Sequence, residues 1–224
     1  MMTDPTILGG ISVLLVDDHA LLRETLRERL CREEDLRVVA TANDAGEAIK
    51  LAAVHHPDVV LMDIDMPGQS CFEAANQIKR SDPACSILFL SAFFHDRYIE
   101  SALAAQASGY ITKDEHPDII IKALRNAAED VAYFSPKVQD RLVIDASGVK
   151  LASAGKSRGS LLTQRELEVL RHLARGLPKK EVAQLMHVSV KTVSRHTEKL
   201  MEKLDIHDRV ELARYAIREG LAEA

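Results

Sequence analysis

Five short apolar runs alternate with amphipathic segments over residues 1–130, and this alternation is the feature that most restricts the fold. The runs are Ile11–Asp18, Leu36–Thr41, Asp58–Asp63, Ser86–Ser91 and Ser108–Thr112. Their nearly continuous hydrophobicity is typical of strands that are buried on both faces. The alternation predicts an α/β fold, a five-stranded doubly wound parallel sheet with right-handed crossovers. Such sheets carry functional residues at the carboxyl ends of their strands.

The segments between the runs carry apolar residues at helical spacing. In ALLRETLRERL, for example, Leu22, Leu26 and Leu30 fall on one stripe of a helix. The segments AGEAIKLAAV, CFEAANQIKR, DRYIESALAAQ and PDIIIKALRNAAE follow the same pattern. We therefore predict a domain over residues 10–130 in which each strand is followed by a helix.

The pattern changes after this domain. Residues 131–160 are rich in Ser, Gly and Lys, so we interpret them as a linker with a short helix over Pro136–Ile144. Residues 161–224 are predicted to form a small all-α domain of four helices. The first begins at the capping box of Thr163 and Glu166, and the others run from Pro178 to about His187, from Val190 to about Leu204, and from Arg209 to about Glu219. Two short helices joined by a tight turn predict a helix-turn-helix.

The charge is spread unevenly along the chain. Residues 1–130 carry 12 Lys and Arg against 22 Asp and Glu, whereas residues 161–224 carry 12 against 10. This difference indicates two domains with different partners. Three scattered cysteines without CxxC spacing argue against a zinc site and favour a reducing cytoplasm. Because the sequence lacks a run that could span a bilayer and a signal peptide pattern, we expect no membrane partner.

Acidic residues follow two strands of the predicted sheet. Asp17 and Asp18 end the first strand, and Asp63 ends the third. These strands lie side by side in a doubly wound sheet, so we expect the three carboxylates to meet at one edge. Like charges this close repel each other, and a divalent cation relieves the repulsion. Oxygen ligands with open positions for water and phosphate suit Mg²⁺, which is therefore the predicted cofactor.

Two further side chains complete the predicted site. Ser91 ends the fourth strand and can donate its hydroxyl to a phosphoryl oxygen, and Lys113 follows the fifth strand and can supply a positive charge. Taken singly, Lys113 is most often a solvated charge and Tyr110 a core aromatic. Their joint arrangement with the acids favours a site for a phosphoryl group. Two functions remain open here, a phosphate acceptor in a signalling switch and an aspartate-dependent phosphatase.

The motifs LLVDDH, LMDIDMPG, LFLSA and GYITKD, in that order, resemble the receiver domain of bacterial response regulators, whose fold is flavodoxin-like. The tail from Leu162 to Ile217 is similar to the LuxR-type helix-turn-helix. Together they resemble the NarL/FixJ family of two-component regulators over nearly the whole chain. A phosphatase would not account for the tail. The resemblance implies a transcription factor rather than an enzyme.

The resemblance also implies residue roles. Asp63 matches the phosphoacceptor, which a sensor histidine kinase would phosphorylate, and Lys113 matches the lysine that holds the phosphoryl group. Ser91 and Tyr110 match the hydroxyl and aromatic pair of the switch. The residues that match the Mg²⁺ ligands are Asp17 (through water), Asp18, Asp63 and Asp65 (through its backbone carbonyl).

One position departs from the family pattern. Cys71 stands where family members usually have Gly, and such a Gly often serves a backbone angle that other residues adopt at a cost. We therefore expect the loop after Gly68 to be shaped differently. This departure keeps a second hypothesis open, a receiver that works without phosphorylation and is gated by protein contacts.

The third tail helix, VKTVSRHTEKLMEKL, is predicted to enter the major groove of double-stranded DNA. By the resemblance, Ser194, Arg195 and Glu198 fall where family members contact bases, and Arg can bond guanine while Glu can accept from cytosine. The residues better placed for phosphates are Lys179, Lys191, Thr192, His196 and Lys199. The weak positive charge of the tail indicates that a single copy binds DNA poorly, so we expect an active homodimer. The fourth helix either forms the dimer surface or closes the core of the tail.

Overall fold

The computed structural model describes residues 10–92, 95–145, 148–151, 161–219 and 221. These residues form two compact units. The first unit contains the described residues up to Ala92 together with residues 104–135, and the second contains the described residues of 93–103 and of 136–224. No helix in these described ranges is long and apolar enough to cross a membrane.

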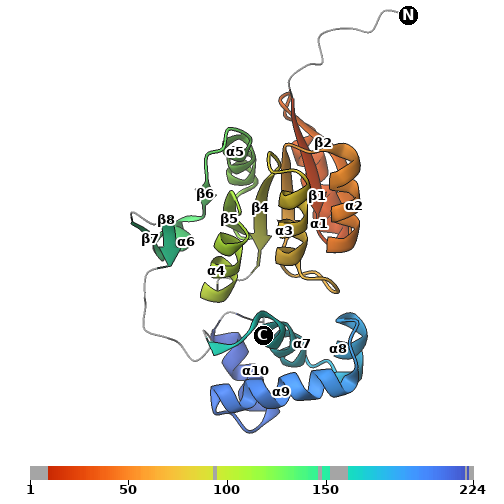
Figure 1. Ribbon diagram of the computed structural model, residues 1–224, viewed down its shortest axis with the longest axis vertical. Coiled ribbons are helices and arrows are strands. Elements are labelled where there is room, and N and C mark those ends of the chain that lie inside the picture. The colour runs from red at the N-terminus through yellow and green to blue at the C-terminus, as the bar shows by residue number, and fades with distance from the viewer. Residues whose placement is uncertain (1–9, 93–94, 146–147, 152–160, 220, 222–224) are drawn as a thin grey trace, which may run out of the picture. The chain divides into compact units, whose positions relative to one another are not determined.

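A parallel sheet with the strand order β2-β1-β3-β4-β5-β6 forms the centre of the first unit (Figure 1). Its strands are β1 (Ile11–Val16), β2 (Leu36–Ala42), β3 (Val59–Asp63), β4 (Ser86–Ser91), β5 (Gly109–Thr112) and β6 (Tyr133–Phe134). The chain crosses from β1 to β2 at one side and returns to β3 on the other, which is the predicted doubly wound topology. The α/β class is therefore confirmed.

Helices cover both faces of this sheet. Helices α1 (Ala20–Leu30) and α5 (Pro117–Ala128) share a core with one face, and α2 (Ala45–His55) and α3 (Cys71–Ser81) pack against each other on the opposite face. The predicted stripe of α1 is buried at Leu26 and Leu30, which are 5% and 1% exposed. Each such leucine contributes about 1.5–3 kcal/mol through burial of its apolar surface.

The structure adds a sixth strand that the sequence did not predict. Tyr133 and Phe134 of β6 pair in parallel with Gly109 and Tyr110 of β5. A strand of two residues has no periodicity to detect, because it is defined only by the backbone groups it bonds. The first residues of the predicted linker are therefore part of the sheet.

The helix predicted over Pro136–Ile144 is only partly correct. Helix α6 ends at Gln139, and the chain then forms an antiparallel hairpin of β7 (Leu142–Asp145) and β8 (Gly148–Leu151). Neighbouring β-branched residues, Val143 and Ile144, favour the strand because their χ1 freedom is restricted in a helix. The Arg141 guanidinium before β7 lies 2.8 Å from a carboxylate oxygen of Asp96, at the start of α4 (Asp96–Ala104).

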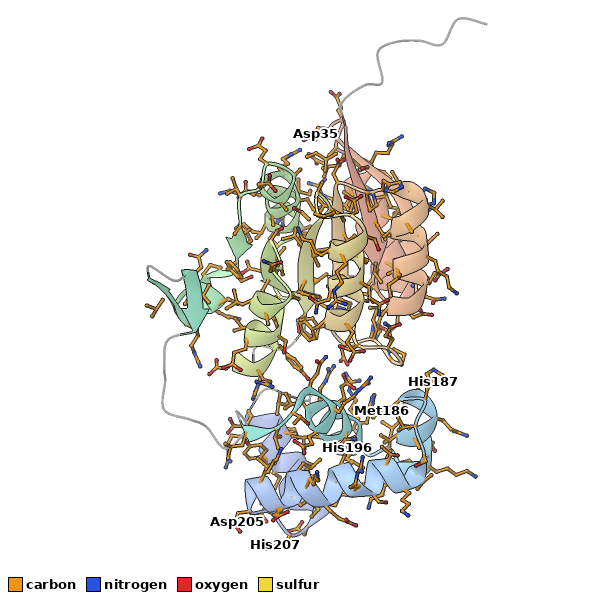
Figure 2. All side chains as sticks on the ribbon, in the orientation of Figure 1. Asp35, Met186, His187, His196, Asp205 and His207 are labelled. Atoms are coloured by element: carbon orange, nitrogen blue, oxygen red, sulfur yellow. The ribbon has the colours of Figure 1, made fainter. Side chains whose placement is uncertain are left out.

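Four helices make up the tail, as predicted, and they are α7 (Gln164–Ala174), α8 (Lys179–Leu185), α9 (Val190–Leu204) and α10 (Arg209–Arg218). Helix α8 ends two residues before the predicted His187, which adopts a positive φ of 51° beyond Met186 (Figure 2). The inward residues Val193, Leu200 and Leu204 of α9 are buried.

Helix α10 has two different faces. Leu212 and Ala216 are 1% and 0% exposed and close the core of the tail, whereas Val210 is 70% exposed. One of the two predicted roles of this helix, core closure, is therefore seen directly. The other role, a dimer surface, stays a prediction.

The start of α7 is fixed by the predicted capping box. The Thr163 hydroxyl accepts from the Glu166 N–H, and the Glu166 carboxylate accepts from the Thr163 N–H at 2.7 Å. The same carboxylate, which is nearly fully buried, also binds Lys203 Nζ of α9 at 2.6 Å. Burial raises the pKa of Glu166, but Lys203 and the two Thr163 bonds outweigh it and hold that pKa below its usual value.

We predict that Glu166→Ala lowers the free energy of unfolding of the tail by about 2 kcal/mol, because it removes a helix cap and a charge-assisted hydrogen bond. Glu202→Ala, at an exposed position of α9, should cost less than about 0.5 kcal/mol. Urea denaturation followed by circular dichroism measures both values. Equal losses in the two variants would contradict the role assigned to Glu166.

Candidate functional site

Three acidic side chains gather at the carboxyl ends of β1 and β3. The two strands pair in register from Val13 with Val59 to Val16 with Met62. Asp17 and Asp63 are therefore brought to the same edge of the sheet, and each is 1% exposed. One ligand oxygen from each of Asp17, Asp18 and Asp63 lies within 4.8 Å of the others. The sheet topology thus places the three predicted acids together.

Lys113 joins the two buried carboxylates. Its ammonium lies 2.8 Å from Asp17 Oδ2 and 2.9 Å from Asp63 Oδ2. The Lys113 N–H also donates to the Ser91 carbonyl at 2.7 Å, which ties the end of β5 to the end of β4. The position of this lysine is therefore fixed at both its backbone and its ammonium group.

The electrostatic balance of the site makes Asp63 easier to protonate than an ordinary aspartate. Burial raises the pKa of Asp63 to about 6, and the charges of Asp17 and Asp18 add to the rise, although Lys113 opposes it. Burial lowers the pKa of Lys113, but Asp63 and Asp17 outweigh it and raise that pKa above its usual value. One ammonium therefore only partly offsets three carboxylates.

The donor set fits a divalent cation. Asp17, Asp18 and Asp63 offer carboxylate oxygens, which are the ligands that Mg²⁺ prefers. The excess negative charge around the buried Asp63 is the condition that a bound cation relieves. These three residues offer the carboxylate ligands that could hold Mg²⁺ here.

The other predicted residues surround this centre. The Asp65 N–H donates to Asp63 Oδ1 at 3.1 Å, which fixes the loop after β3. Ser91 and Tyr110 are both 0% exposed, and their side chains are hydrogen-bonded to each other. Burial raises the pKa of the Tyr110 phenol. The structure therefore brings the hydroxyl and the aromatic residue into contact, with Tyr110 in the interior.

His19 belongs to this cluster but was not predicted. Its Nδ1 lies 2.9 Å from Asp18 Oδ1, and its N–H donates to Asp17 Oδ1 at 2.7 Å. The available sequence signal was its position directly after the acid pair. The acids alone were sufficient to explain that motif, so the histidine was overlooked.

Cys71 does not adopt the costly backbone angle that a Gly at such a position can serve. The positive φ in this loop, 92°, belongs to Gly68, whereas Cys71 is the first residue of α3. Ser70 caps that helix by accepting from the Glu73 N–H. The buried Cys71 thiol lies 3.6 Å from the Ile64 carbonyl oxygen. Cys71 is thus a small, buried helical residue.

The candidate DNA surface lies on α9. A surface hollow of about 440 Å³ lies along the start of this helix. Its lining residues are exposed or half-buried, and they are Ser189, Lys191, Thr192, Ser194, Arg195 and Glu198. Lys199 is also exposed, and Lys179 of α8 lies with its Nζ 3.5 Å from Ser194 Oγ. His196, which is labelled in Figure 2, differs from them, because it is half-buried and its Nδ1 is enclosed. Its ring is therefore a poorer phosphate ligand than the exposed lysines.

Two family models match the chain. Residues 13–125 match the response regulator receiver domain, and residues 160–216 match the bacterial regulatory proteins of the luxR family. The oxygen regulatory protein NreC of Staphylococcus epidermidis is 35% identical over 217 residues, which are 95% of this chain and 100% of NreC. The response regulator VraR of Staphylococcus aureus is 33% identical over 216 residues, 95% of this chain and 99% of VraR.

Solved structures agree with these matches. A LuxR-family response regulator from Aurantimonas is 34% identical with a TM-score of 0.57, over 59% of this chain and 94% of that one. RcsB of Salmonella enterica, solved on promoter DNA with the phosphomimetic BeF3-, is 24% identical with a TM-score of 0.67, over 92% and 98% of the two chains. At this identity RcsB supports the fold alone.

Without divalent cations, the raised pKa of Asp63 predicts a pH-dependent stability. The native state binds the proton up to about pH 6, whereas an unperturbed Asp has a pKa of 3.8. The native state therefore holds more protons between these values, and stability falls as pH rises through them, by on the order of 3 kcal/mol. Asp63→Asn removes this dependence. Denaturation in chelator at several pH values measures it.

The matched control is Asp140→Asn, which changes an exposed acid. The difference in unfolding free energy between Asp63→Asn and the wild type should grow from pH 4 to pH 7, while the Asp140→Asn difference stays flat. A flat difference for Asp63→Asn would mean that this carboxyl is ionised throughout.

Proposed function

The chain belongs to the NarL/FixJ family of DNA-binding two-component response regulators, and on this basis we propose that phosphorylation of Asp63 controls its binding to DNA. The observation that carries the proposal is the buried set of Asp17, Asp63 and Lys113, with the ammonium between the two carboxylates. A lysine held there can pair with a phosphoryl oxygen as soon as one arrives. The hydrogen-bonded pair of Ser91 and Tyr110 supports a switch beside the same site.

The proposed chemistry is a phosphoryl transfer from a sensor histidine kinase. An oxygen of the Asp63 carboxylate attacks phosphorus, the P–N bond of the phosphohistidine breaks, and the imidazole leaves with the electron pair and takes up a proton. Mg²⁺ held by Asp17, Asp18, Asp63 and the Asp65 carbonyl would neutralise the phosphoryl oxygens. Lys113 binds one of these oxygens, and the Ser91 hydroxyl donates to another.

The output follows from the switch pair. When the Ser91 hydroxyl turns toward the phosphoryl group, it leaves its contact with Tyr110, and the aromatic ring moves into the space that is freed. Both arrangements of the Ser91 and Tyr110 pair exist before phosphorylation. The phosphoryl group shifts the population toward the arrangement that binds it better.

The proposed domains are a receiver over 10–130, a linker over 131–160 and a DNA-binding domain over 161–224.

We further propose that α9 enters the major groove of double-stranded DNA. Arg195 and Glu198 are exposed and Ser194 is half-buried beside them, so this group supplies the base contacts. The phosphate contacts come mainly from Lys179, Lys191, Thr192 and Lys199. Dimerisation of the phosphorylated form doubles these contacts. A DNA target places the protein in the bacterial cytoplasm.

We predict that the wild type gains one phosphoryl group when it is incubated with Mg²⁺ and acetyl phosphate, and that Asp63→Asn gains none. The reason is that the acceptor carboxylate is absent from the variant. Intact mass measures the adduct. Asp65→Asn is the matched control in the same loop, because the role proposed for Asp65 uses its backbone carbonyl, and this variant should be phosphorylated.

The outcomes separate the two hypotheses. An adduct of equal yield on Asp63→Asn would place the acceptor elsewhere. A folded wild type that binds Mg²⁺ and forms no adduct would contradict phosphorylation and favour gating by protein contacts.

We predict that Arg195→Ala weakens binding to a DNA site selected from a random pool by about 1–3 kcal/mol and relaxes the preference at one base pair. Lys191→Ala is the control for a phosphate contact. It should weaken binding to all DNA sequences alike and reduce the slope of log affinity against log salt concentration by about 1. Titrations at several salt concentrations measure both. Uniform weakening by Arg195→Ala would assign this residue to the phosphates instead.

A further inference from the structure

Residues 133–135, which are β6 and the residue after it, lie along the outer edge of β5. The Tyr133 N–H donates to the Ser108 carbonyl at 2.9 Å, and the Ser135 N–H donates to the Tyr110 carbonyl at 3.0 Å. The Ser135 hydroxyl then accepts from the Thr112 N–H at 3.1 Å. Ser135 therefore bonds β5 on both sides of Ile111, once with its backbone and once with its side chain.

The fit between the two segments is close. A Cβ atom built on Gly109 would lie 2.0 Å from the Tyr133 carbonyl oxygen, so any larger residue at this position would displace β6. Ser135 is 0% exposed and Thr112 is 4% exposed. The Thr112 N–H is thus buried, and loss of the Ser135 hydroxyl would leave it without its acceptor.

The bonded positions on β5 are those of the switch. Tyr110 is the aromatic member of the switch pair, and Lys113 directly follows Thr112. The Lys113 N–H is held by the Ser91 carbonyl at 2.7 Å on the β4 side. The Thr112 N–H is held by Ser135 on the β6 side. The two peptide groups that flank Thr112, the second of which leads into the phosphate-binding lysine, are therefore bonded on opposite sides, one to Ser135 directly after β6 and the other to Ser91 at the end of β4.

We propose that Ser135 is a positioning residue for Lys113 and the first point at which the state of the site reaches the linker. This inference rests on the proposed function. When Lys113 moves to bind the phosphoryl group and Tyr110 changes place, the backbone bonded to Ser135 moves with them. Ser135 is the last residue of the first unit, and α6 begins at Pro136. The displacement therefore enters the chain that leads to the DNA-binding tail.

A purely structural role for β6, in which it only covers a sheet edge, predicts something different. In that case the loss of the Ser135 hydroxyl lowers stability but leaves phosphorylation and its effect on DNA binding unchanged. The test therefore needs two functional measurements on the full-length chain. These are the initial rate of phosphorylation by acetyl phosphate and the ratio of DNA affinities with and without the phosphoryl group.

The test compares Ser135→Ala with Ser108→Ala, which removes a hydroxyl that makes no hydrogen bond within the described part of the chain. We expect Ser135→Ala to lower both the rate and the affinity ratio by about fivefold, the order of one lost hydrogen bond. Ser108→Ala should leave both near the wild-type values. Ser135→Thr keeps the acceptor and should restore both.

Four outcomes are informative. If the wild type is phosphorylated and gains affinity while Ser135→Ala matches Ser108→Ala, the inference is overturned and the proposed function stands. If the wild type forms no adduct, both fail. If Ser135→Ala is less stable but keeps the wild-type phosphorylation rate and affinity ratio, β6 only covers the sheet edge and the inference is overturned. A Ser135→Ala loss that Ser135→Thr restores supports the inference.

A second measurement covers the case in which Ser135→Ala does not fold. Hydrogen exchange on the wild type, with and without Mg²⁺ and beryllofluoride, follows peptides that contain 109–113 and 133–135. We expect the protection of both segments to change together. A change in 109–113 with constant protection in 133–135 would overturn the inference.

Discussion

Asp17 and Asp63 place two carboxylates, each 1% exposed, at the ends of neighbouring strands, and the Lys113 ammonium lies 2.8 and 2.9 Å from them. Without the lysine, the buried charge of Asp17 would raise the pKa of Asp63 further, and the repulsion between the two carboxylates would loosen the edge of the sheet. The lysine makes the arrangement tolerable but does not neutralise it, because Asp18 adds a third charge. The site is therefore stable with Lys113 and still favours a further cation.

This arrangement depends on the strand order. β1 and β3 are neighbours because the chain crosses from one side of the sheet to the other between β2 and β3, and β5 brings Lys113 to the same edge. The strands could be predicted because buried parallel strands are nearly continuous apolar runs, and the doubly wound topology makes the first and third of them neighbours. The meeting of Asp17 and Asp63 follows from this adjacency, whereas the contact of Lys113 also needs its long side chain to reach across β4. The helices of the tail were equally predictable, since capping residues and apolar stripes are local signals.

Other features could not be predicted from local patterns. The strand β6 is defined only by backbone bonds to β5, and the hairpin after α6 depends on pairing between residues that the composition marks as a linker. The effect of Cys71 was misjudged because the positive φ lies three residues earlier, at Gly68. His196 has helical spacing that suits an outward residue, but packing encloses its Nδ1. In each case a tertiary contact decides what the sequence leaves open.

The phosphorylation that we propose would act on the charge balance of the site. An acyl phosphate carries about two negative charges and extends beyond the carboxylate that it modifies. The Lys113 ammonium already pairs with both Asp17 and Asp63, so the new negative charge would change how strongly it pairs with each of them.

The backbone around Lys113 is bonded on both sides. The Lys113 N–H is bonded to Ser91, and the N–H of its neighbour Thr112 is bonded to Ser135. A shift of the ammonium must therefore be absorbed by the side chain or shared with these two contacts. Since the Lys113 side chain is 17% exposed and packed among the acids, its freedom to absorb the shift alone is limited. In the proposed switch, the contacts that stabilise the unmodified site would thus also determine which neighbouring segments respond to phosphorylation.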